Sequence, residues 1–190
     1  MRKIQKSIDE FFNDALTCNI NLSENNRNGY PAVINFFKNI QVFTKENLIQ
    51  GFYMVYSFMP TIGDISNTNY QECTKIINNV KNHIFPSNSD LNNLSSLTNN
   101  SLVGASKLLH FINPDMIPIF DSRVCRYLVK GNPGNLVTKT DFFIQYVDFC
   151  ESVISHKEFD IIRKKVSHIF QYKISDLRIC ELIMYLEGHR

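Results

Sequence analysis

Apolar residues recur every three or four positions along most of this chain, the spacing that places them on one face of an α-helix. In the clearest case, the residues that share a face are Ala105, Leu108, Leu109 and Ile112. The same pattern predicts further helices, which begin near Lys3, Pro31, Thr44, Asn69, Leu91, Asp121, Thr138 or Thr140, Phe159 and Ile179. No stretch alternates apolar and polar residues for long enough to predict a strand, so the pattern predicts an all-α fold.

Prolines predict where several of these helices end. Pro114 forces the residue before it out of the α region, so the preceding helix stops there. Pro118 keeps the following apolar run short and extended, and its composition predicts that it is buried. Asp121 then begins the next helix as its N-cap residue. Nearer the N-terminus, Pro60 and Gly63 predict a break between helices.

The segment around this connection contains a set of residues with a characteristic order. Val103 and Gly104 lead into one helix, and Asp121 opens the next, with an apolar residue three positions later and Arg126 five positions later. This order resembles the core of the helix-hairpin-helix DNA glycosylases of base-excision repair, in which a glycine-rich hairpin precedes a catalytic aspartate. The resemblance covers residues 100–128. It implies two helical lobes that flank a groove around a helix-hairpin-helix core.

The segment also departs from that family's pattern. Ser101 replaces the usual proline of the hairpin, and Leu102 replaces its first glycine. Ser106 stands where the lyase branch of the family has its catalytic lysine. Lys107 follows one position later, about 100° further round an α-helix. The connection from Lys107 to Asp121 is also shorter than the family's usual one.

Three polar residues around this connection are candidate catalytic residues: Asp121, whose role the resemblance implies, Lys107, and His110, which lies three residues after Lys107 on the same side of the helix. The Asp121 carboxylate would stabilise positive charge on the sugar or activate water; alternatively, it is a helix cap that contributes about 1 kcal/mol. Lys107 would form a Schiff base with the sugar, or it is a solvated or phosphate-binding lysine. His110 would act as acid or base, or it is a structural histidine bonded to a loop carbonyl.

The residues expected to contact DNA are Val103, Gly104, Ala105, Ser106, Arg123 and Arg126. Gly104 would let the hairpin backbone approach a phosphate, although the same glycine could serve close packing alone. The two arginines would contact phosphates, or one would pair with Asp115 or Glu151. The cluster formed by residues 163–165 is either a solvated helix face or an extension of the backbone-binding track.

Length and composition agree with one folded unit. A chain of 190 residues that is 44% apolar can bury a substantial core. We expect a single all-helical domain across 1–190 with two lobes, one of about 1–85 with the C-terminal helices and one of about 88–135 around the hairpin. The net charge of +2 and pI near 8.2 permit nucleic-acid binding but do not by themselves predict it.

Cysteine usage predicts reduced thiols rather than disulfides. The five cysteines are scattered singly, and no C-x-x-C pair suggests zinc or an iron–sulfur cluster. We therefore expect no metal and no cofactor. The N-terminal region lacks a signal-peptide core, and no apolar run is long enough to span a membrane. These features predict a soluble, cytoplasmic protein with no membrane partner.

The leading hypothesis is a DNA glycosylase-like protein that cleaves the N-glycosidic bond of a flipped damaged or modified base. Because the chain has no tryptophan, a phenylalanine, tyrosine or histidine must stack on such a base. One alternative is a non-catalytic module that binds nucleic acid or protein on the same scaffold, for example in defence against phage. A second alternative is a glycosidase of nucleosides or modified nucleotides, which the nearly neutral charge favours.

Overall fold

A computed structural model describes residues 3–188 except 22, 24, 58, 60–64 and 66–68, and only the backbone of 25 and 26. All regular secondary structure in these residues is helical, which confirms the all-α prediction; the predicted break at Pro60 and Gly63 lies outside them. The α-helices are α1 (Ile8–Thr17), α2 (Tyr30–Lys38), α3 (Lys45–Tyr56), α4 (Tyr70–Lys81), α5 (Asn88–Leu97), α6 (Leu102–Ile112), α7 (Ser122–Val129), α8 (Thr140–Ile154), α9 (Phe159–Ser167) and α10 (Asp176–Glu187). A π-helical turn (Asn25–Gly29) precedes α2, and a 3₁₀ turn (Leu136–Thr138) precedes α8.

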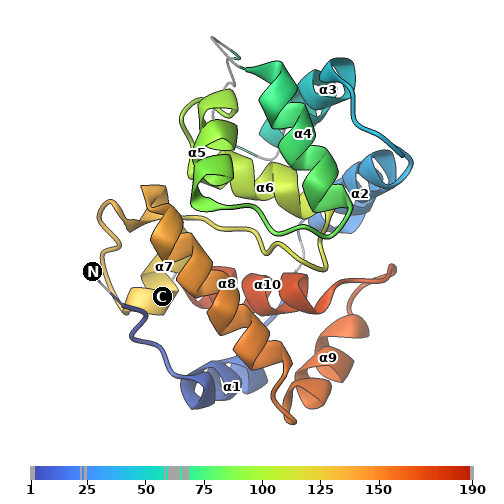
Figure 1. The fold of residues 1–190 in the computed structure, drawn as a ribbon. Helices are drawn as coiled ribbons and strands as arrows, with labels where there is room; N and C mark the ends of the chain where they lie inside the picture. Colours follow the sequence, from blue (N-terminus) through green and yellow to red (C-terminus); the bar gives the residue numbers. More distant parts are fainter. Residues whose placement is uncertain are drawn as a thin grey trace.

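The helices form two groups (Figure 1), which meet where α5 contacts α8 and α6 contacts the 3₁₀ turn before α8. Helices α2 to α6 pack against one another, whereas α1 packs with α8, α9 and α10, and α10 packs on α7 and α8. The grouping differs from the division expected from the sequence, in which α5, α6 and α7 shared a lobe. The extended segment between α6 and α7 separates them, so that each joins a different group.

Short side chains define where several helices begin. Thr44 and Asn47 form the capping box of α3, as the sequence predicted. The first helix begins only at Ile8, because Ser7 and Glu10 form a second capping box there. In each case a side chain satisfies a backbone N–H that the first turn of a helix leaves without a partner.

Helices α5 and α6 form a tight hairpin whose turn, 98–101, contains two residues in the left-handed region. Asn99 has a φ of 57° and Asn100 a φ of 54°, a conformation that asparagine tolerates better than most residues. Gly104 lies on α6 directly against the turn, where an added Cβ would stand 2.9 Å from the Cβ of Thr98. Since the Thr98 hydroxyl donates to the carbonyl groups of Leu94 on α5 and Ser101 in the turn, the side chain cannot move away easily. Gly104 therefore lets the two arms of the hairpin pack closely.

Residues 117–120 of the connection between α6 and α7 are buried, as the sequence predicted for its apolar run, and side-chain hydroxyls on either side bond to its backbone. The N–H of Phe120 donates to the hydroxyl of Ser106 on α6 at 3.1 Å. The hydroxyl of Tyr146 on α8 donates to the carbonyl of Ile119 at 2.8 Å. Both bonds act on the residues directly before Asp121, so they determine where the N-terminus of α7 lies.

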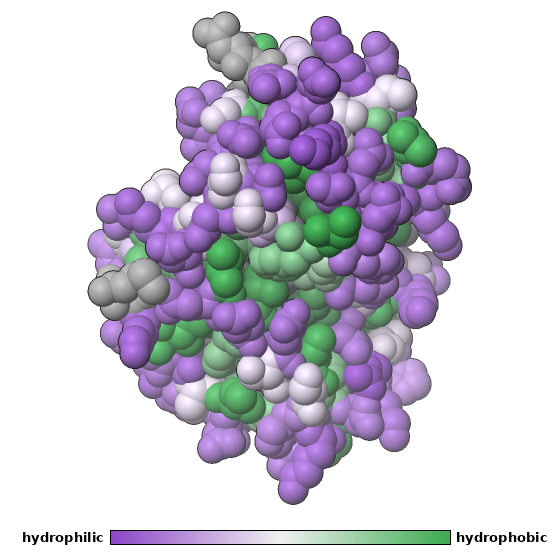
Figure 2. Space-filling view, in the orientation of Figure 1, coloured by the Kyte–Doolittle hydropathy of each residue, from purple (hydrophilic) through white to green (hydrophobic). Residues whose placement is uncertain are grey.

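Helix α10 is the central element of the second group. Its residues 177–184 are all buried, including the charged Arg178 and Glu181. On the face shown in Figure 2, hydrophilic residues cover most of the surface, and hydrophobic residues gather mainly near the middle. The five cysteines are all buried. None of the helices described is long and apolar enough to cross a membrane.

Candidate functional site

Asp121 is the N-cap residue of α7, and its carboxylate is held by one oxygen. Its Oδ1 accepts hydrogen bonds from the N–H groups of Arg123 and Val124, each at 2.9 Å. Among the residues that the structure describes, no group donates to Oδ2. The cap predicted from the sequence is therefore confirmed, and it leaves one carboxylate oxygen available.

Asp121 lies at the edge of two adjoining hollows. The smaller has a volume of about 180 Å³ and the larger about 510 Å³, and both are lined by Lys107, Asp121 and Tyr185. The larger hollow extends to the hairpin, where Asn99, Ser101 and Val103 line it. The smaller hollow leads inward, and its other walls are Ser23, Tyr30, Phe111, Ile119, Arg178, Glu181 and Leu182.

Lys107 is half-buried and lines both hollows, so it does not lie on a solvated helix face. Burial lowers the pKa of its ammonium group, and the nearby carboxylates of Asp121 and Glu181 act in the opposite direction. No hydrogen-bond acceptor lies within bonding distance of the ammonium group in the described part of the chain. A half-buried amine with a lowered pKa and no partner is suited to chemistry with a ligand in the hollow.

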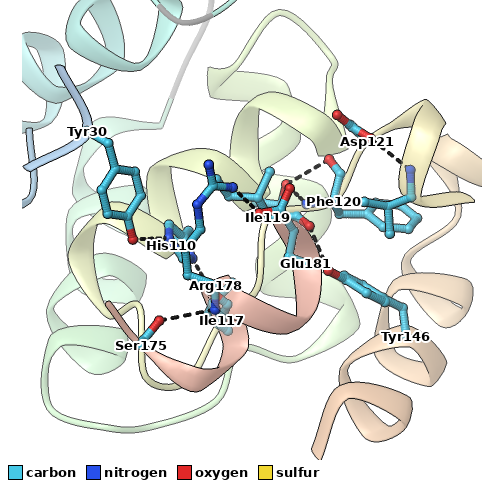
Figure 3. Close-up of polar contacts among 12 residues, drawn as sticks. Tyr30, His110, Ile117, Ile119, Phe120, Asp121, Tyr146, Ser175, Arg178 and Glu181 are labelled. Carbon is cyan, nitrogen blue, oxygen red and sulfur yellow. Dashed lines mark hydrogen bonds and ion pairs between the residues drawn. The ribbon is translucent and has the colours of Figure 1, made fainter. Parts of the chain in front are cut away.

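His110 does not line either hollow, and its expected role in acid–base catalysis is not supported by its position. Its side chain is completely buried. Nδ1 lies 2.7 Å from the carbonyl oxygen of Ile117, and Nε2 lies 2.8 Å from the hydroxyl of Tyr30 (Figure 3). Burial lowers the pKa of the imidazole to about 3, so the ring is neutral. His110 is the structural histidine, bonded to a loop carbonyl, that the sequence allowed as the alternative.

The four residues expected to approach DNA at the start of α6 have different environments. Val103 is half-buried and lines the larger hollow, whereas Gly104, Ala105 and Ser106 are buried. The Ser106 side chain points to the α6–α7 connection. Only Val103 therefore presents a side chain to the hollow, and the close packing of Gly104 supports its alternative role.

The two arginines of α7 point in different directions. Arg123 lines the larger hollow, and its guanidinium lies 4.5 Å from the centre of the Tyr185 ring. Arg126 instead donates from Nη1 to the carbonyl of Gly188 at 3.3 Å, at the end of α10. A Cβ on Gly188 would stand 2.1 Å from the carbonyl oxygen of Arg123, so α7 and α10 meet closely here. Of the two, only Arg123 remains a candidate for phosphate contact at the hollow.

Two of the three basic residues in the cluster 163–165 have structural partners. Arg163 forms a bidentate pair with Asp176, and Lys165 donates to carbonyl groups at the end of α1, including Ala15 at 2.9 Å. Lys164 is exposed. Most of this cluster thus joins α9 to neighbouring helices, which argues against a continuous track for a DNA backbone.

A buried ion pair in the smaller hollow joins Arg178 and Glu181 (Figure 3). Neither residue was predicted from the sequence to belong to the site. Arg178 Nη1 donates to Glu181 Oε2, and the guanidinium lies 5.0 Å from the centre of the Tyr30 ring. Burial raises the pKa of Glu181 to about 7, although the attraction of Arg178 opposes this shift. No described group donates to Glu181 Oε1.

A sequence signal for this pair exists in α10. A helix that is apolar on almost every face has no surface on which to solvate an arginine and a glutamate. Spaced three apart, Arg178 and Glu181 must share a face and satisfy each other inside the protein. Tyr185 lies one turn further along the same face and completes the stripe that borders the hollow.

Taken together, the smaller hollow combines Lys107 and Arg178 with Asp121 and Glu181. Such a balanced set of charges can bind a neutral polar molecule and stabilise charge that develops during a reaction. The described residues contain no group of three or more histidine, cysteine, aspartate or glutamate side chains placed to hold a metal ion.

Comparison of the chain with protein-family models, with curated proteins and with solved structures finds no match.

Proposed function

We propose that the protein is a DNA glycosylase-like enzyme in which the smaller hollow receives a flipped base and Asp121 assists cleavage of its N-glycosidic bond. The observation that carries this proposal is that Asp121 and Lys107 line the same two hollows, where Asp121 Oδ2 and the Lys107 ammonium group are available to a ligand. Neither group has a protein partner among the described residues that would occupy it.

The position of Asp121 suits the chemistry of this reaction. As the base leaves, positive charge develops on the sugar, and a fixed carboxylate beside it lowers the energy of that state. The N–H groups of Arg123 and Val124 hold the carboxylate in place, so little reorganisation is needed during the reaction. The nucleophile is then either the amine of Lys107 or a water molecule that Asp121 activates.

The larger hollow provides a place for the nucleic-acid backbone. Val103 and the hairpin turn form one side and Arg123 the other. The N–H groups of Leu102 and Val103, in the first turn of α6, donate to no described atom, and such groups favour an anion nearby. A DNA strand that lies in the larger hollow would place one of its nucleotides beside Lys107 and Asp121.

A second candidate is a glycosidase that acts on nucleosides or modified nucleotides. The net charge of +2 favours it, because it provides little general attraction for DNA. A free nucleoside would need the smaller hollow and little of the larger one.

The test is a base-release screen with oligonucleotides that carry varied lesions and modified bases, run beside the matching free nucleosides. We expect the wild-type protein to release a base from at least one oligonucleotide, and Asp121→Asn to reduce the rate by about 100-fold or more. Asparagine is also a good N-cap residue, so the variant should fold. Release from nucleosides alone would favour the second candidate.

The matched control is Asp141→Asn, which changes an exposed aspartate in the first turn of α8, outside both hollows. It should release bases at the wild-type rate. If neither oligonucleotides nor nucleosides lose a base, or if Asp121→Asn and the wild type are equally active, the proposed function is wrong.

A further inference from the structure

We propose that Glu181 selects the base that enters the smaller hollow, because its Oε1 accepts a hydrogen bond from an N–H group on the edge of that base. This inference rests on the proposed function for the entry of a base, and it adds the chemical class of base that the site prefers. Such a base carries an amino group or a ring N–H on its inner edge.

The position of Glu181 supports a role in recognition. Glu181 is only 1% exposed, and its side chain borders the smaller hollow. Oε2 accepts a hydrogen bond from Arg178, whereas no described group donates to Oε1. Since no buried side-chain oxygen of the described residues lacks a hydrogen-bond partner, Oε1 is open to the hollow rather than enclosed in the core, and a ligand there can donate to it.

Arg178 determines what Glu181 can offer a ligand. A guanidinium group has donors only, so the atom of residue 181 that faces it must be an acceptor. The two oxygens of a carboxylate satisfy this requirement and leave a second acceptor for the hollow. Helix α10 holds both side chains, and Ser175 caps that helix through the N–H of Arg178 at 3.2 Å.

The charges around the hollow argue for a neutral heterocycle rather than a phosphate. Asp121 and Glu181 would repel an anion that penetrated as far as Ile119, even though Lys107 and Arg178 are nearby. A neutral base with donors and acceptors can instead match the alternating charges. The phosphate would remain at the larger hollow, near Arg123.

Aromatic side chains define how such a base would lie. The Tyr30 ring already packs against Arg178 on α10 and stacks with Tyr172 at a centroid distance of 5.8 Å. Tyr185 lines both hollows and is half-buried. Since Tyr185 borders the route from the larger hollow to the smaller, we expect it to stack on the base while Glu181 contacts the inner edge.

A matched pair of probes isolates the hydrogen bond. 9-Methyladenine and 9-methylpurine differ only in the exocyclic amino group, and the methyl group occupies the nitrogen to which the sugar is attached. At pH 8, where Glu181 is mainly ionised, we expect ligand-observed NMR to show about tenfold or tighter binding of 9-methyladenine to the wild-type protein. A carboxylate has no proton to donate to the 9-methylpurine nitrogens.

The Glu181→Gln variant should reverse this preference. The carbonyl oxygen of glutamine must face Arg178, so its amide N–H₂ group points into the hollow as a donor. We therefore expect 9-methylpurine to bind the variant at least as tightly as 9-methyladenine. Glu151→Gln, an exposed change on α8, should retain the wild-type preference.

The outcomes separate this inference from the proposed function. If the wild type shows no preference, binds neither probe, or keeps its preference in Glu181→Gln, the role of Glu181 is wrong, whatever the release assay shows. If the preference reverses as expected but no oligonucleotide or nucleoside loses a base, Glu181 still recognises a base and the glycosylase proposal fails.

Discussion

The hydroxyl of Ser106 accepts a hydrogen bond from the N–H of Phe120 at 3.1 Å, although Ser106 lies on α6 and Phe120 lies 14 residues later, near the end of the α6–α7 connection. The same hydroxyl lies 2.9 Å from the carbonyl oxygen of Val103 and 3.2 Å from that of Phe120, so it can donate to either. Since Asp121 is the next residue after Phe120, this contact ties the candidate catalytic carboxylate to the helix that carries Lys107.

Replacement of Ser106 by alanine should therefore affect both stability and activity. The buried N–H of Phe120 would lose its partner, which costs about 1–3 kcal/mol of unfolding free energy. Base release should fall but remain measurable, because the carboxylate stays in place with less accurate positioning. Urea unfolding and single-turnover release would measure the two effects. Ser152→Ala, on the exposed side of α8, should change neither, and an equal loss in both variants would contradict the assigned role.

The packing of the hairpin predicts that Gly104→Ala destabilises the protein. A Cβ at this position would lie 2.9 Å from Thr98 Cβ, and Thr98 is held by its own hydrogen bonds. We expect a loss of about 1–3 kcal/mol, more than the roughly 1 kcal/mol by which alanine favours a helix over glycine. At Gly131 an added Cβ meets nothing within 4 Å, so Gly131→Ala is the matched control. If the Gly104→Ala protein is as stable as that control, Gly104 is not needed for the close packing of α5 and α6.

The parts of the site that depend on neighbouring residues were predictable from the sequence. Asp121 caps α7 through N–H groups two and three positions later, an interaction that any folded context would allow. Helix α6 was also predictable, because its apolar spacing is regular. Residues on one helix face or in one turn determine such features, so the pattern of the chain contains the information.

The parts that depend on packing between distant segments were not predictable. The sequence allowed a solvated helix face for Lys107, yet α6 is buried on nearly every side and Lys107 borders a hollow instead. Glu181 reaches Asp121 and Lys107 only because α10 packs beside α7. No periodicity in α6 alone indicates which distant helix provides the opposite wall. The composition of α10 indicates that Arg178 and Glu181 pair inside the protein, but not that they lie beside Asp121 and Lys107.

Lys107 should form a covalent imine with an abasic-site oligonucleotide. Its amine would add to the sugar aldehyde with loss of water, and the lowered pKa from burial leaves more of the amine unprotonated. Borohydride reduces that imine to a stable amine, so we expect a trapped complex on denaturing gels. Lys107→Met should abolish trapping, whereas Lys164→Met, at an exposed position, should not. Full trapping in Lys107→Met would show that the nucleophile is another group.

The pH dependence of stability offers a test of the buried groups beside the hollow. In the folded protein the pKa of His110 is lowered to about 3 from an ordinary value of 6.5. Its contribution to the free energy of unfolding is therefore fully present above pH 6.5 and is lost as the pH falls toward 3. The folded pKa of Glu181 is raised to about 7 from 4.5, so its contribution is present below pH 4.5 and is lost as the pH rises through 7. Between pH 4.5 and 6.5, therefore, the free energy of unfolding rises with pH because of His110 and falls with pH because of Glu181.

Single substitutions should therefore reveal opposite slopes. Relative to wild type, Glu181→Gln leaves the His110 effect alone, and its unfolding free energy should rise by about 1.4 kcal/mol per pH unit from pH 4.5 to 6.5. His110→Gln leaves the Glu181 effect alone, and its unfolding free energy should fall by a similar amount relative to wild type over the same range. Urea titrations at pH 4.5, 5.5 and 6.5 would measure these differences, which remain informative even if both variants are less stable. Slopes of the same sign would mean that one of the two side chains is more accessible to water than the structure places it.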